Sequence, residues 1–297
     1  MSVAAEVDEA LLRTMPLPRH GDDEDKDARG RVLVIGGSVE VPGGALLAGI
    51  GALRAGAGKL QIATCRSVAP GMALAVPEAR VIGLDESAEG EIAPAGADRV
   101  ADLARPCDAV LLGPGMMDGA GAGLLAARLL TRAEGACFVL DAAALHRLHD
   151  GRDALARGAA AGRVVLTPHA GEMARLLGVP RDAVLADRLG AARQAAAELQ
   201  AVVAMKGSAT FIVTPQGQAW SCDRGNVGLA TSGSGDTLAG ILAGLLARGA
   251  APLHAAAWAV FLHAEAGARL ARSRGPVGFL ARELLAEIPA IMAGLAR

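Results

Sequence analysis

The stretch GNVGLATSGSGDTLAGILAGLL, residues 225–246, is the part of the chain around which we expect the fold to be organised. It begins as a glycine-rich loop and turns, at Asp236, into an apolar run that predicts a buried helix. Gly233 and Gly235 lack a Cβ atom, so their backbone N–H groups can approach a ligand at the positive end of that helix. The stretch therefore predicts an anion site that suits phosphate.

Asp236 places a carboxylate at the mouth of this loop, where it would repel a bound phosphate. A carboxylate in that position is explained by a chemical task, such as taking a proton from a substrate hydroxyl. The alternative is that Asp236 only caps a helix after a flexible turn. The polar residues at other expected strand ends favour the catalytic interpretation.

The composition argues against several classes of protein. Of the 297 residues, 52% are hydrophobic and 20% are charged, which is enough to bury a large core. A net charge of −2 and 2% aromatic residues give no support to a nucleic-acid partner or an anionic membrane surface. The acidic start of the chain does not look like a signal peptide, and no apolar run is long enough for a membrane span. We therefore expect a cytoplasmic protein.

The four cysteines are far apart in the sequence and form no Cys-x-x-Cys pair. They are Cys65, Cys107, Cys137 and Cys222. Three of them lie in or beside apolar runs, so we expect small buried thiols in a reducing compartment and no zinc site.

Short β-branched runs alternate with Ala- and Leu-rich runs, which predicts an α/β fold with a mostly parallel sheet covered by helices on both faces. Strands are expected at 31–35, 59–64, 79–84, 108–112, 137–141, 163–167, 202–206 and 210–214. Helices are expected at 44–55, 97–104, 123–131, 172–177, 181–199, 236–248, 252–272 and 281–295. No linker divides the chain, so we expect one domain over 31–297, preceded by a segment over 1–30 whose polar run at 20–30 is a solvated loop.

Polar residues and glycines recur at the carboxyl ends of the expected strands, where open α/β sheets bind ligands. They are Gly36-Gly37-Ser38, Gly113-Pro114-Gly115, Asp141, Thr167-Pro168-His169 and Lys206-Gly207. Each alone has an ordinary explanation as a turn, a cap, a structural histidine or an edge charge. Together, upstream of the Gly-Ser-Gly-Asp loop, they favour a ligand site. His254 and His263 lie in a later expected helix without metal-ligand spacing, and we expect them to serve packing or capping.

Three common site motifs are missing from the sequence. There is no Gly-x-Gly-x-x-Gly dinucleotide fingerprint, no Gly-x-x-x-x-Gly-Lys-Ser/Thr loop and no Gly-x-Ser-x-Gly between a strand and a helix. Rossmann, P-loop and serine-hydrolase interpretations are therefore disfavoured.

Together these motifs resemble the ribokinase-like superfamily, and within it the ADP/ATP-dependent NAD(P)H-hydrate dehydratases. The matching stretches are VLVIGGS (32–38), ALRAGAG (52–58), LLGPG (111–115), LD (140–141), LTPHAGEMARLLG (166–178), KGSAT (206–210) and GNVGLATSGSGDTLAG (225–240). The resemblance covers nearly all of the chain after residue 15 and implies a three-layer α/β/α sandwich. The Thr-Pro-His stretch and KGSAT are specific to this branch, whereas the Gly-Asp loop marks only the superfamily.

The resemblance also implies roles for residues. Gly44, Gly115, His169 and Asp236 fall where the family contacts the hydrated nicotinamide nucleotide. Lys206, Gly207, Ser208, Ala209, Thr210, Gly233 and Gly235 fall where it holds ADP or ATP. Asp236 falls at the catalytic acid/base position, and no residue is expected to be a dedicated ligand of the Mg²⁺ cofactor. Departures from the family pattern occur at Gly44, Ala143, Ala170 and Ser232, where Ala, Asp, Pro and Gly are usual.

The implied reaction restores NADH or NADPH from the S epimer of its hydrate, NADHX or NADPHX. Asp236 would take the proton of the ring hydroxyl as that oxygen attacks the terminal phosphoryl of ADP or ATP, and phosphate would then leave. The resemblance suggests a homotetramer and a separate NAD(P)H-hydrate epimerase as a functional companion, because no epimerase domain precedes the first strand expected near residue 31. The alternatives are a kinase of the same superfamily, acting on an alcohol such as a thiamine precursor, and a non-catalytic nucleotide sensor.

Overall fold

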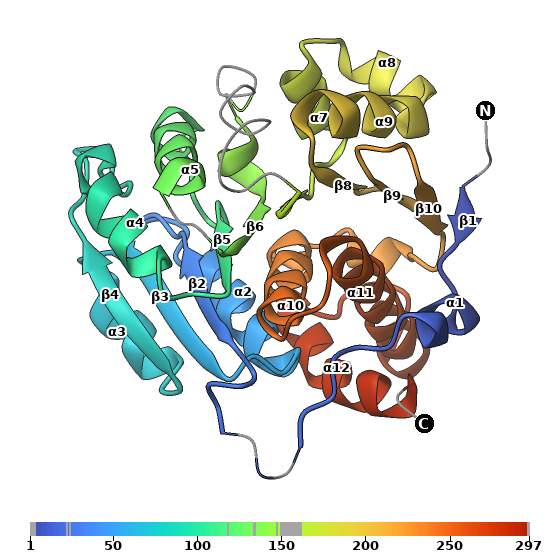
Figure 1. The fold of residues 1–297 in the computed structure, drawn as a ribbon, viewed down its shortest axis with the longest axis horizontal. Coiled ribbons are helices and arrows are strands. Elements are labelled where there is room, and N and C mark those ends of the chain that lie inside the picture. The colour runs from blue at the N-terminus through green and yellow to red at the C-terminus, as the bar shows by residue number, and fades with distance from the viewer. Residues whose placement is uncertain are drawn as a thin grey trace.

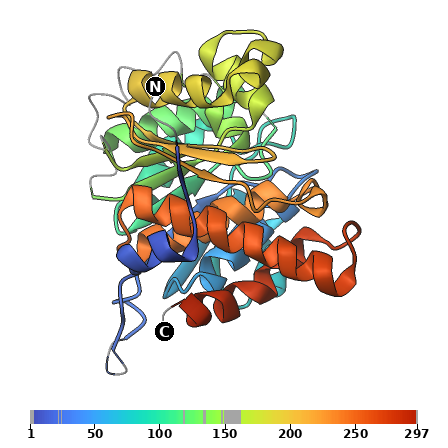
Figure 2. The same cartoon turned by 90° about the vertical axis from the view of Figure 1, so that its right-hand side faces the viewer.

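The computed structural model describes residues 4–21, 23, 25–117, 119–132, 135–146, 148 and 162–295. Within these residues the chain forms one ten-stranded sheet between two layers of helices (Figures 1 and 2). The strands are β1 (Ala5–Glu6), β2 (Arg31–Ile35), β3 (Lys59–Cys65), β4 (Ala79–Leu84), β5 (Ala109–Leu112), β6 (Cys137–Leu140), β7 (Val164–Leu166), β8 (Val202–Met205), β9 (Thr210–Val213) and β10 (Ala219–Cys222).

The α-helices that cover the sheet are α1 (Glu9–Thr14), α2 (Gly43–Arg54), α3 (Ala69–Ala75), α4 (Ala97–Ala104), α5 (Gly119–Arg132), α7 (Ala170–Leu177), α8 (Arg181–Ala186), α9 (Arg188–Leu199), α10 (Ser234–Ala247), α11 (Pro252–Arg274) and α12 (Ala281–Leu295). Short 3₁₀ turns are η1 (Pro94–Gly96), η2 (Ala142–Leu145) and η3 (Val227–Leu229). The expected three-layer α/β/α sandwich is confirmed.

The strand order is β1-β10-β9-β8-β7-β6-β5-β2-β3-β4. Strand β9 pairs antiparallel with both β8 and β10, and the other pairings are parallel. The chain runs from β2 outward to β4 and then returns to place β5 on the other side of β2. The loops that follow β2 and β5 therefore leave the same edge in neighbouring positions, which is where sheets of this kind bind ligands.

Alternating side chains of the sheet build two separate cores. Val32 and Val34 of β2 face the layer that contains α2, α10, α11 and α12. Leu33 and Ile35 of the same strand face the layer that contains α4, α5, α7 and α9. Because both faces are covered, the central strands are continuously apolar instead of alternating.

Helices α2 and α10 pack together so closely that glycine is required at their contact. A Cβ atom on Gly240 or Gly244 of α10 would overlap the backbone carbonyl oxygen of Ala48 or Ala52 of α2, respectively. A Cβ atom on Gly51 of α2 would in turn come within 3.0 Å of the carbonyl oxygen of Thr237. The two backbones therefore touch along much of their length.

Several elements were missed or merged at the level of sequence. The expected helix over 181–199 is two helices, because the Asp187 side chain accepts a hydrogen bond from the Gly190 amide (2.8 Å) and begins α9 there. The N-terminal segment is more than a lead-in, since β1 pairs with β10 and both Val7 and Leu12 are fully buried. Strand β10 and helix α3 were also not predicted.

The polar run at 20–30 is mostly exposed where it is described, and Asp22 and Glu24 lie outside the described residues. Cys65, Cys107 and Cys222 are buried free thiols, while Cys137 is half-buried. Among the described residues, no helix combines the length and the apolar character needed to cross a bilayer.

We expect Gly240→Ala to destabilise the protein, although alanine normally stabilises a helix relative to glycine. Overlap with the Ala48 carbonyl should lower the free energy of unfolding by about 1–3 kcal/mol. Gly71→Ala in α3 is the matched control, because no atom lies within 4 Å of its added Cβ atom. It should raise the free energy of unfolding by about 0.5–1 kcal/mol. Urea denaturation measures both, and equal effects would contradict the packing argument.

Candidate active site

The N-terminus of α10 is built as a tight, amide-rich turn. Gly233 is the N-cap and has φ of 86°, in the left-handed region that glycine adopts without strain. A Cβ atom there would also lie 2.5 Å from Leu47 of α2. The hydroxyl of Thr237 donates a 2.6 Å hydrogen bond to the carbonyl of Ser234, which closes the first turn. The amides of this turn point outward at the positive end of the helix, as an anion site requires.

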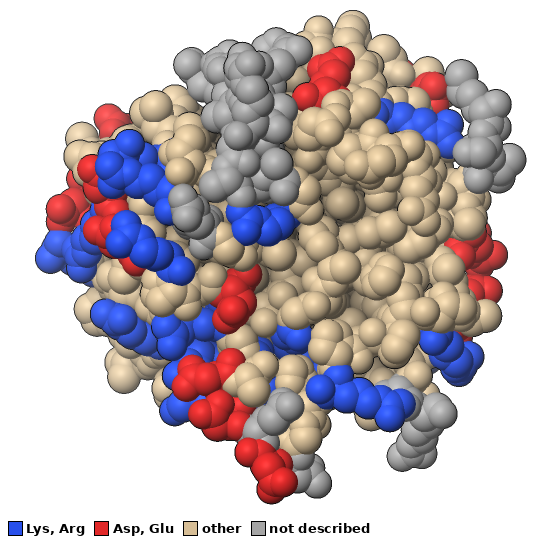
Figure 3. Space-filling view, in the orientation of Figure 1, with Lys and Arg blue, Asp and Glu red and all other residues tan. Residues whose placement is uncertain are grey.

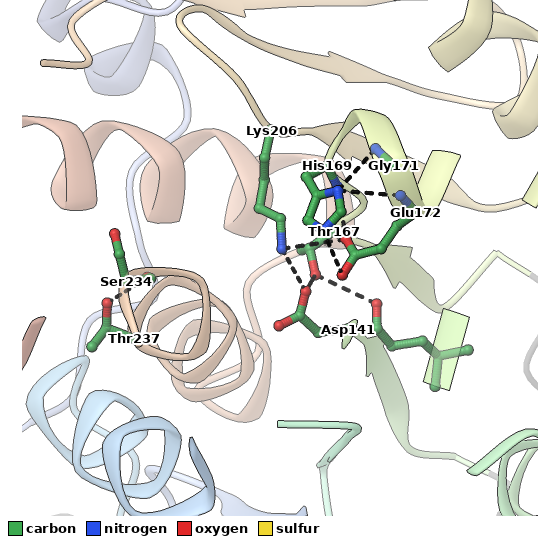
Figure 4. A network of polar contacts seen from close by, with 9 residues as sticks. Asp141, Thr167, His169, Gly171, Glu172, Lys206, Ser234 and Thr237 are labelled. Carbon is green, nitrogen blue, oxygen red and sulfur yellow. Dashed lines mark hydrogen bonds and ion pairs between the residues drawn. The ribbon is translucent and has the colours of Figure 1, made fainter. Parts of the chain in front are cut away.

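A buried network of one ammonium and two carboxylates faces this turn from the ends of β6, β7 and β8 (Figure 4). Lys206 Nζ donates to Asp141 Oδ1 at 2.7 Å, and the hydroxyl of Thr167 donates to the same oxygen at 2.7 Å. Glu172 Oε2 lies 3.8 Å from the ammonium. Burial alone would lower the pKa of Lys206, but Asp141 and Glu172 raise it, with a net upward shift. The lysine therefore remains charged.

His169 anchors the start of α7 by a reciprocal capping arrangement (Figure 4). Its Nδ1 accepts hydrogen bonds from the amides of Gly171 (2.9 Å) and Glu172 (3.2 Å), while a Glu172 oxygen accepts from the His169 amide (2.8 Å). This box forms with Ala170 in place of the usual proline, so proline is not needed to begin the helix here. The half-exposed imidazole lies at the edge of the site, and its Nε2 is 3.3 Å from Glu172 Oε1.

Asp236 lies in the first turn of α10 and is half-buried. Its pKa is raised to about 7, first because burial removes the carboxylate from water and second because Asp141 lies nearby with the same charge. Lys206 opposes this shift and Glu172 adds to it. A carboxyl group with a pKa near 7 is matched to proton transfer at neutral pH, so Asp236 has the electrostatics of a general base.

A cavity of about 850 Å³ opens beside α10 and is bounded by the β8–β9 turn, η3 and α11. Its polar lining includes His169, Lys206, Ser208, Ser234 and His263. Its apolar lining comes from Cys222, Val227, Leu229, Leu238, Val260 and Ala264. Charged side chains are sparse on the surface over α10 and α11 in the view of Figure 3. The cavity thus combines polar groups beside the anion loop with apolar side chains, and its size suits a nucleotide.

Gly44 and Gly115 meet at the topological switch between β2 and β5. A Cβ atom on Gly44 would lie 2.5 Å from the Gly115 amide nitrogen, so the start of α2 presses directly on the loop after β5. The loops are joined by hydrogen bonds from Gly37 to the Pro114 carbonyl (2.8 Å) and from Ser38 to the Gly115 carbonyl (2.9 Å). Contact between Leu47 of α2 and Gly233 brings the loops after β2 and β5 and the anion loop to the same edge of the sheet.

The structure brings most of the residues implied by the resemblance to one edge. Lys206, Gly207, Ser208, Thr210 and Gly235 line the cavity with His169, and Gly233 shapes its loop. Ala209 does not line this cavity; its carbonyl accepts a hydrogen bond from Arg188. Gly44 and Gly115 lie outside the lining of this cavity, at the neighbouring switch point.

Other residues at the site were not included among the predicted site residues. In the sequence, Asp141 and Thr167 were noted only as polar residues at strand ends, and Glu172 was noted only as part of the stretch LTPHAGEMARLLG. Their spacing carries no local signal of an ion pair with Lys206, because 65 residues separate Lys206 from Asp141. His263 was expected to serve packing or capping, but its Nε2 lies 2.9 Å from Ser234 Oγ in the cavity. A contact between residues this far apart in the sequence produces no periodic pattern from which it could be predicted.

The architecture and site define a ribokinase-like protein, as comparison with solved structures shows. The crystal structure of ADP/ATP-dependent NAD(P)H-hydrate dehydratase from Bacillus subtilis, co-crystallised with ATP and Mg²⁺, matches with a TM-score of 0.83 and 31% identity. The match covers 98% of this chain and 99% of that one. The NAD(P)H-hydrate dehydratase family model matches residues 32–290, and the chain belongs to that family.

Curated relatives agree with this assignment. An ADP-dependent (S)-NAD(P)H-hydrate dehydratase from Xanthomonas campestris is 50% identical over 290 residues, covering 97% of this chain and 96% of the relative. A bifunctional NAD(P)H-hydrate repair enzyme from Moorella thermoacetica is 38% identical over 279 residues. The match covers 94% of this chain but only 52% of that longer protein.

We expect Asp236→Asn to stabilise the protein in a pH-dependent way. The folded pKa near 7 lies above the ordinary value of 3.8, so ionisation of Asp236 costs folding stability as pH rises between these values. The difference in Tm between variant and wild type should be small at pH 4 and reach a few degrees above pH 7. Differential scanning calorimetry measures it.

Asp182→Asn is the control, because Asp182 also lies in the first turn of a helix but is exposed. It should lower stability slightly through the helix dipole. A Tm difference for Asp236→Asn that is equal at pH 4 and pH 8 would contradict the burial argument.

Proposed function

We propose that this chain catalyses the ADP- or ATP-dependent dehydration of the S epimer of NADHX or NADPHX. The products are NADH or NADPH, phosphate, and AMP or ADP. The observation that carries the proposal is Asp236, a half-buried carboxyl with a pKa near 7, at the mouth of an amide-rich turn. Family membership and the 50% identical ADP-dependent relative support it.

The proton step follows from the position of Asp236. The hydroxyl on C6 of the reduced nicotinamide ring gives its proton to Asp236 as its oxygen attacks the terminal phosphoryl group, and AMP or ADP leaves. The C6–O bond then breaks with the electron pair on phosphate, assisted by the ring nitrogen lone pair. Loss of a neighbouring ring proton restores the double bond. This sequence replaces hydroxide, a poor leaving group, with phosphate.

Charge on the transferring phosphoryl group is balanced by groups that are already in place. The amides around Gly233 and Gly235 and the ammonium of Lys206 offer donors at the polar end of the cavity. Lys206 is held by Asp141 at 2.7 Å, so it needs little reorganisation when the phosphates bind. We assign the adenine nucleotide to this cavity, along Lys206–Thr210, and the hydrated nicotinamide nucleotide to Gly44, Gly115 and His169.

The residues present fit a Mg²⁺ ion that enters with the nucleotide. Mg²⁺ is usually held by one or two carboxylates together with substrate phosphates and water, and Asp141 and Glu172 supply oxygen ligands beside Lys206. Within the described residues, no three His, Cys, Asp or Glu side chains gather as a metal site of their own. When bound, Mg²⁺ would neutralise phosphate charge.

We further propose that residues 31–297 form one catalytic domain, that the protein acts in the cytoplasm, and that it assembles as a homotetramer. Exposed apolar side chains near the switch point, Val39, Val41 and Met117, support a self-association surface. A separate NAD(P)H-hydrate epimerase would supply the S epimer from the R epimer.

We expect wild-type protein to restore the absorbance of reduced nicotinamide from hydrated NADH in the presence of Mg²⁺ and ADP or ATP. Asp236→Asn should lower the rate by roughly 10²–10⁴-fold, because a general base contributes about that much. Its nucleotide affinity should change little. Release of free phosphate, measured in parallel, should match the NADH formed.

The same assay separates the competing functions. A stable phosphorylated product without NADH would identify a small-molecule kinase, and tight nucleotide binding without turnover of any substrate would identify a sensor. A rate for Asp236→Asn within a few-fold of wild type would remove Asp236 from the catalytic role.

We expect kcat/KM to rise with pH through about 7, because the base must be ionised. Asp141→Asn removes the charge that raises the pKa of Asp236 and frees Lys206 to act on it, so the midpoint should move to lower pH. The measurement compares the midpoints of the two pH–rate profiles, and this comparison does not depend on the maximal rate of either protein. An unchanged midpoint in this variant would rule out the proposed coupling between the two carboxylates.

A further inference from the structure

His263 of α11 is a buried polar side chain that the proposed mechanism does not use. Its Nε2 lies 2.9 Å from Ser234 Oγ, across 29 residues of sequence. Both residues line the nucleotide cavity, and both are buried. The pair therefore joins the first residue of α10, beside the anion loop, to α11, which also lines the cavity.

The imidazole is neutral at physiological pH. Burial lowers the pKa of His263 to about 4; a hydrogen bond to the backbone of Ser234 opposes this shift, and the nearby ammonium of Lys206 adds to it. A neutral imidazole carries one N–H group, so its hydrogen bond with Ser234 has a direction. Two directions are possible, and they make opposite predictions for an anion in the cavity.

If Ser234 donated its hydroxyl proton to His263, its oxygen lone pairs would face the phosphates and repel them. If His263 donates from Nε2, the hydroxyl proton of Ser234 is free to reach a phosphate oxygen. The second arrangement forms a chain of donors that ends on the anion, and such chains reinforce one another in a low-dielectric site. The phosphate site therefore favours the Nε2–H form.

We propose that His263 is a positioning residue whose Nε2–H donates to Ser234 Oγ and directs the Ser234 hydroxyl toward a phosphate oxygen of the bound nucleotide. This inference rests on the proposed function, because it requires an adenine nucleotide in the cavity. Ser234 is well suited to the role, since its carbonyl is held by the Thr237 hydroxyl at 2.6 Å and its backbone cannot swing away.

A serine nucleophile activated by histidine does not fit the same geometry. That arrangement needs an imidazole basic enough to take the serine proton and a third group that orients it. The pKa of His263 is lowered to about 4, and its recorded hydrogen bond among the described residues is the one to Ser234. Positioning remains the role that the geometry supports.

The test is a double-mutant cycle on ADP binding, measured by calorimetry with Mg²⁺. Ser234→Ala and His263→Leu should each weaken binding by about tenfold, the usual effect of losing one hydrogen bond to a charged group. The double variant should also be weaker by only about tenfold, because His263 acts through Ser234. An additive loss of about a hundredfold would overturn the proposal, as would no loss in His263→Leu.

Further variants separate positioning from packing. His263→Gln keeps an N–H donor and should recover part of the lost affinity, whereas a packing role predicts a defect as large as that of His263→Leu. His254→Gln, the same substitution elsewhere on α11, should bind ADP as wild type does. Thermal denaturation confirms that each variant is folded. Failure of the wild-type protein to bind ADP would contradict the proposed function itself. Normal binding by the wild type with an unchanged affinity in His263→Leu would contradict only the positioning role of His263.

Discussion

The backbone contact between α2 and α10 is the constraint on which the site depends. Gly240 and Gly244 leave no side chain between the two helices, so the backbones of α2 and α10 touch. At one end of this contact, Leu47 lies against Gly233, and one turn earlier Gly44 lies against Gly115. The distance between the anion loop and the switch point is therefore set by main-chain packing, which is far less adjustable than contacts between long side chains.

The site concentrates several charged side chains at one edge of the sheet. Asp141, Glu172 and Asp236 share one ammonium, that of Lys206, so three carboxyl groups face a single positive charge and two of them lack a full counter-charge. The raised pKa of Asp236 comes first from burial and second from this excess of negative charge. Ala142, immediately after Asp141, has φ of 49°, an unfavourable conformation for a residue with a Cβ atom. Electrostatic and backbone strain thus occur together at the catalytic edge, as is common where structure serves reactivity.

Much of the fold was predictable because its local signals agree. The run from Arg31 to Ile35 was predicted as a strand and is β2, and the stretch 281–295 was predicted as a helix and is α12. Strand β1 could not be predicted, because two residues carry no periodicity and its pairing partner, β10, lies more than 200 residues later in the chain. The break at Asp187 depends on one side-chain cap inside a run that is otherwise helical.

The site was predictable only in part, for a related reason. Motifs indicated which strand ends meet, since parallel strands bring their carboxyl ends to one edge. Motifs could not indicate which polar atoms pair there. The contact between His263 and Ser234 joins α11, whose residues show no distinctive spacing, to the first residue of α10, 29 residues earlier. Only the packing of α11 across the cavity determines it.

The edge of the sheet at β1 has a consequence for how the chain acquires its structure. Ala5 pairs with Trp220, so β1 must wait after its synthesis until its partner strand, β10, has been made. At about 5–20 residues per second, that wait lasts roughly 10–40 s during synthesis. The α2–α10 contact also forms late, because α10 follows all ten strands of the described sheet. Maturation of the anion loop is consequently a late event in biosynthesis, after the strands that surround it already exist.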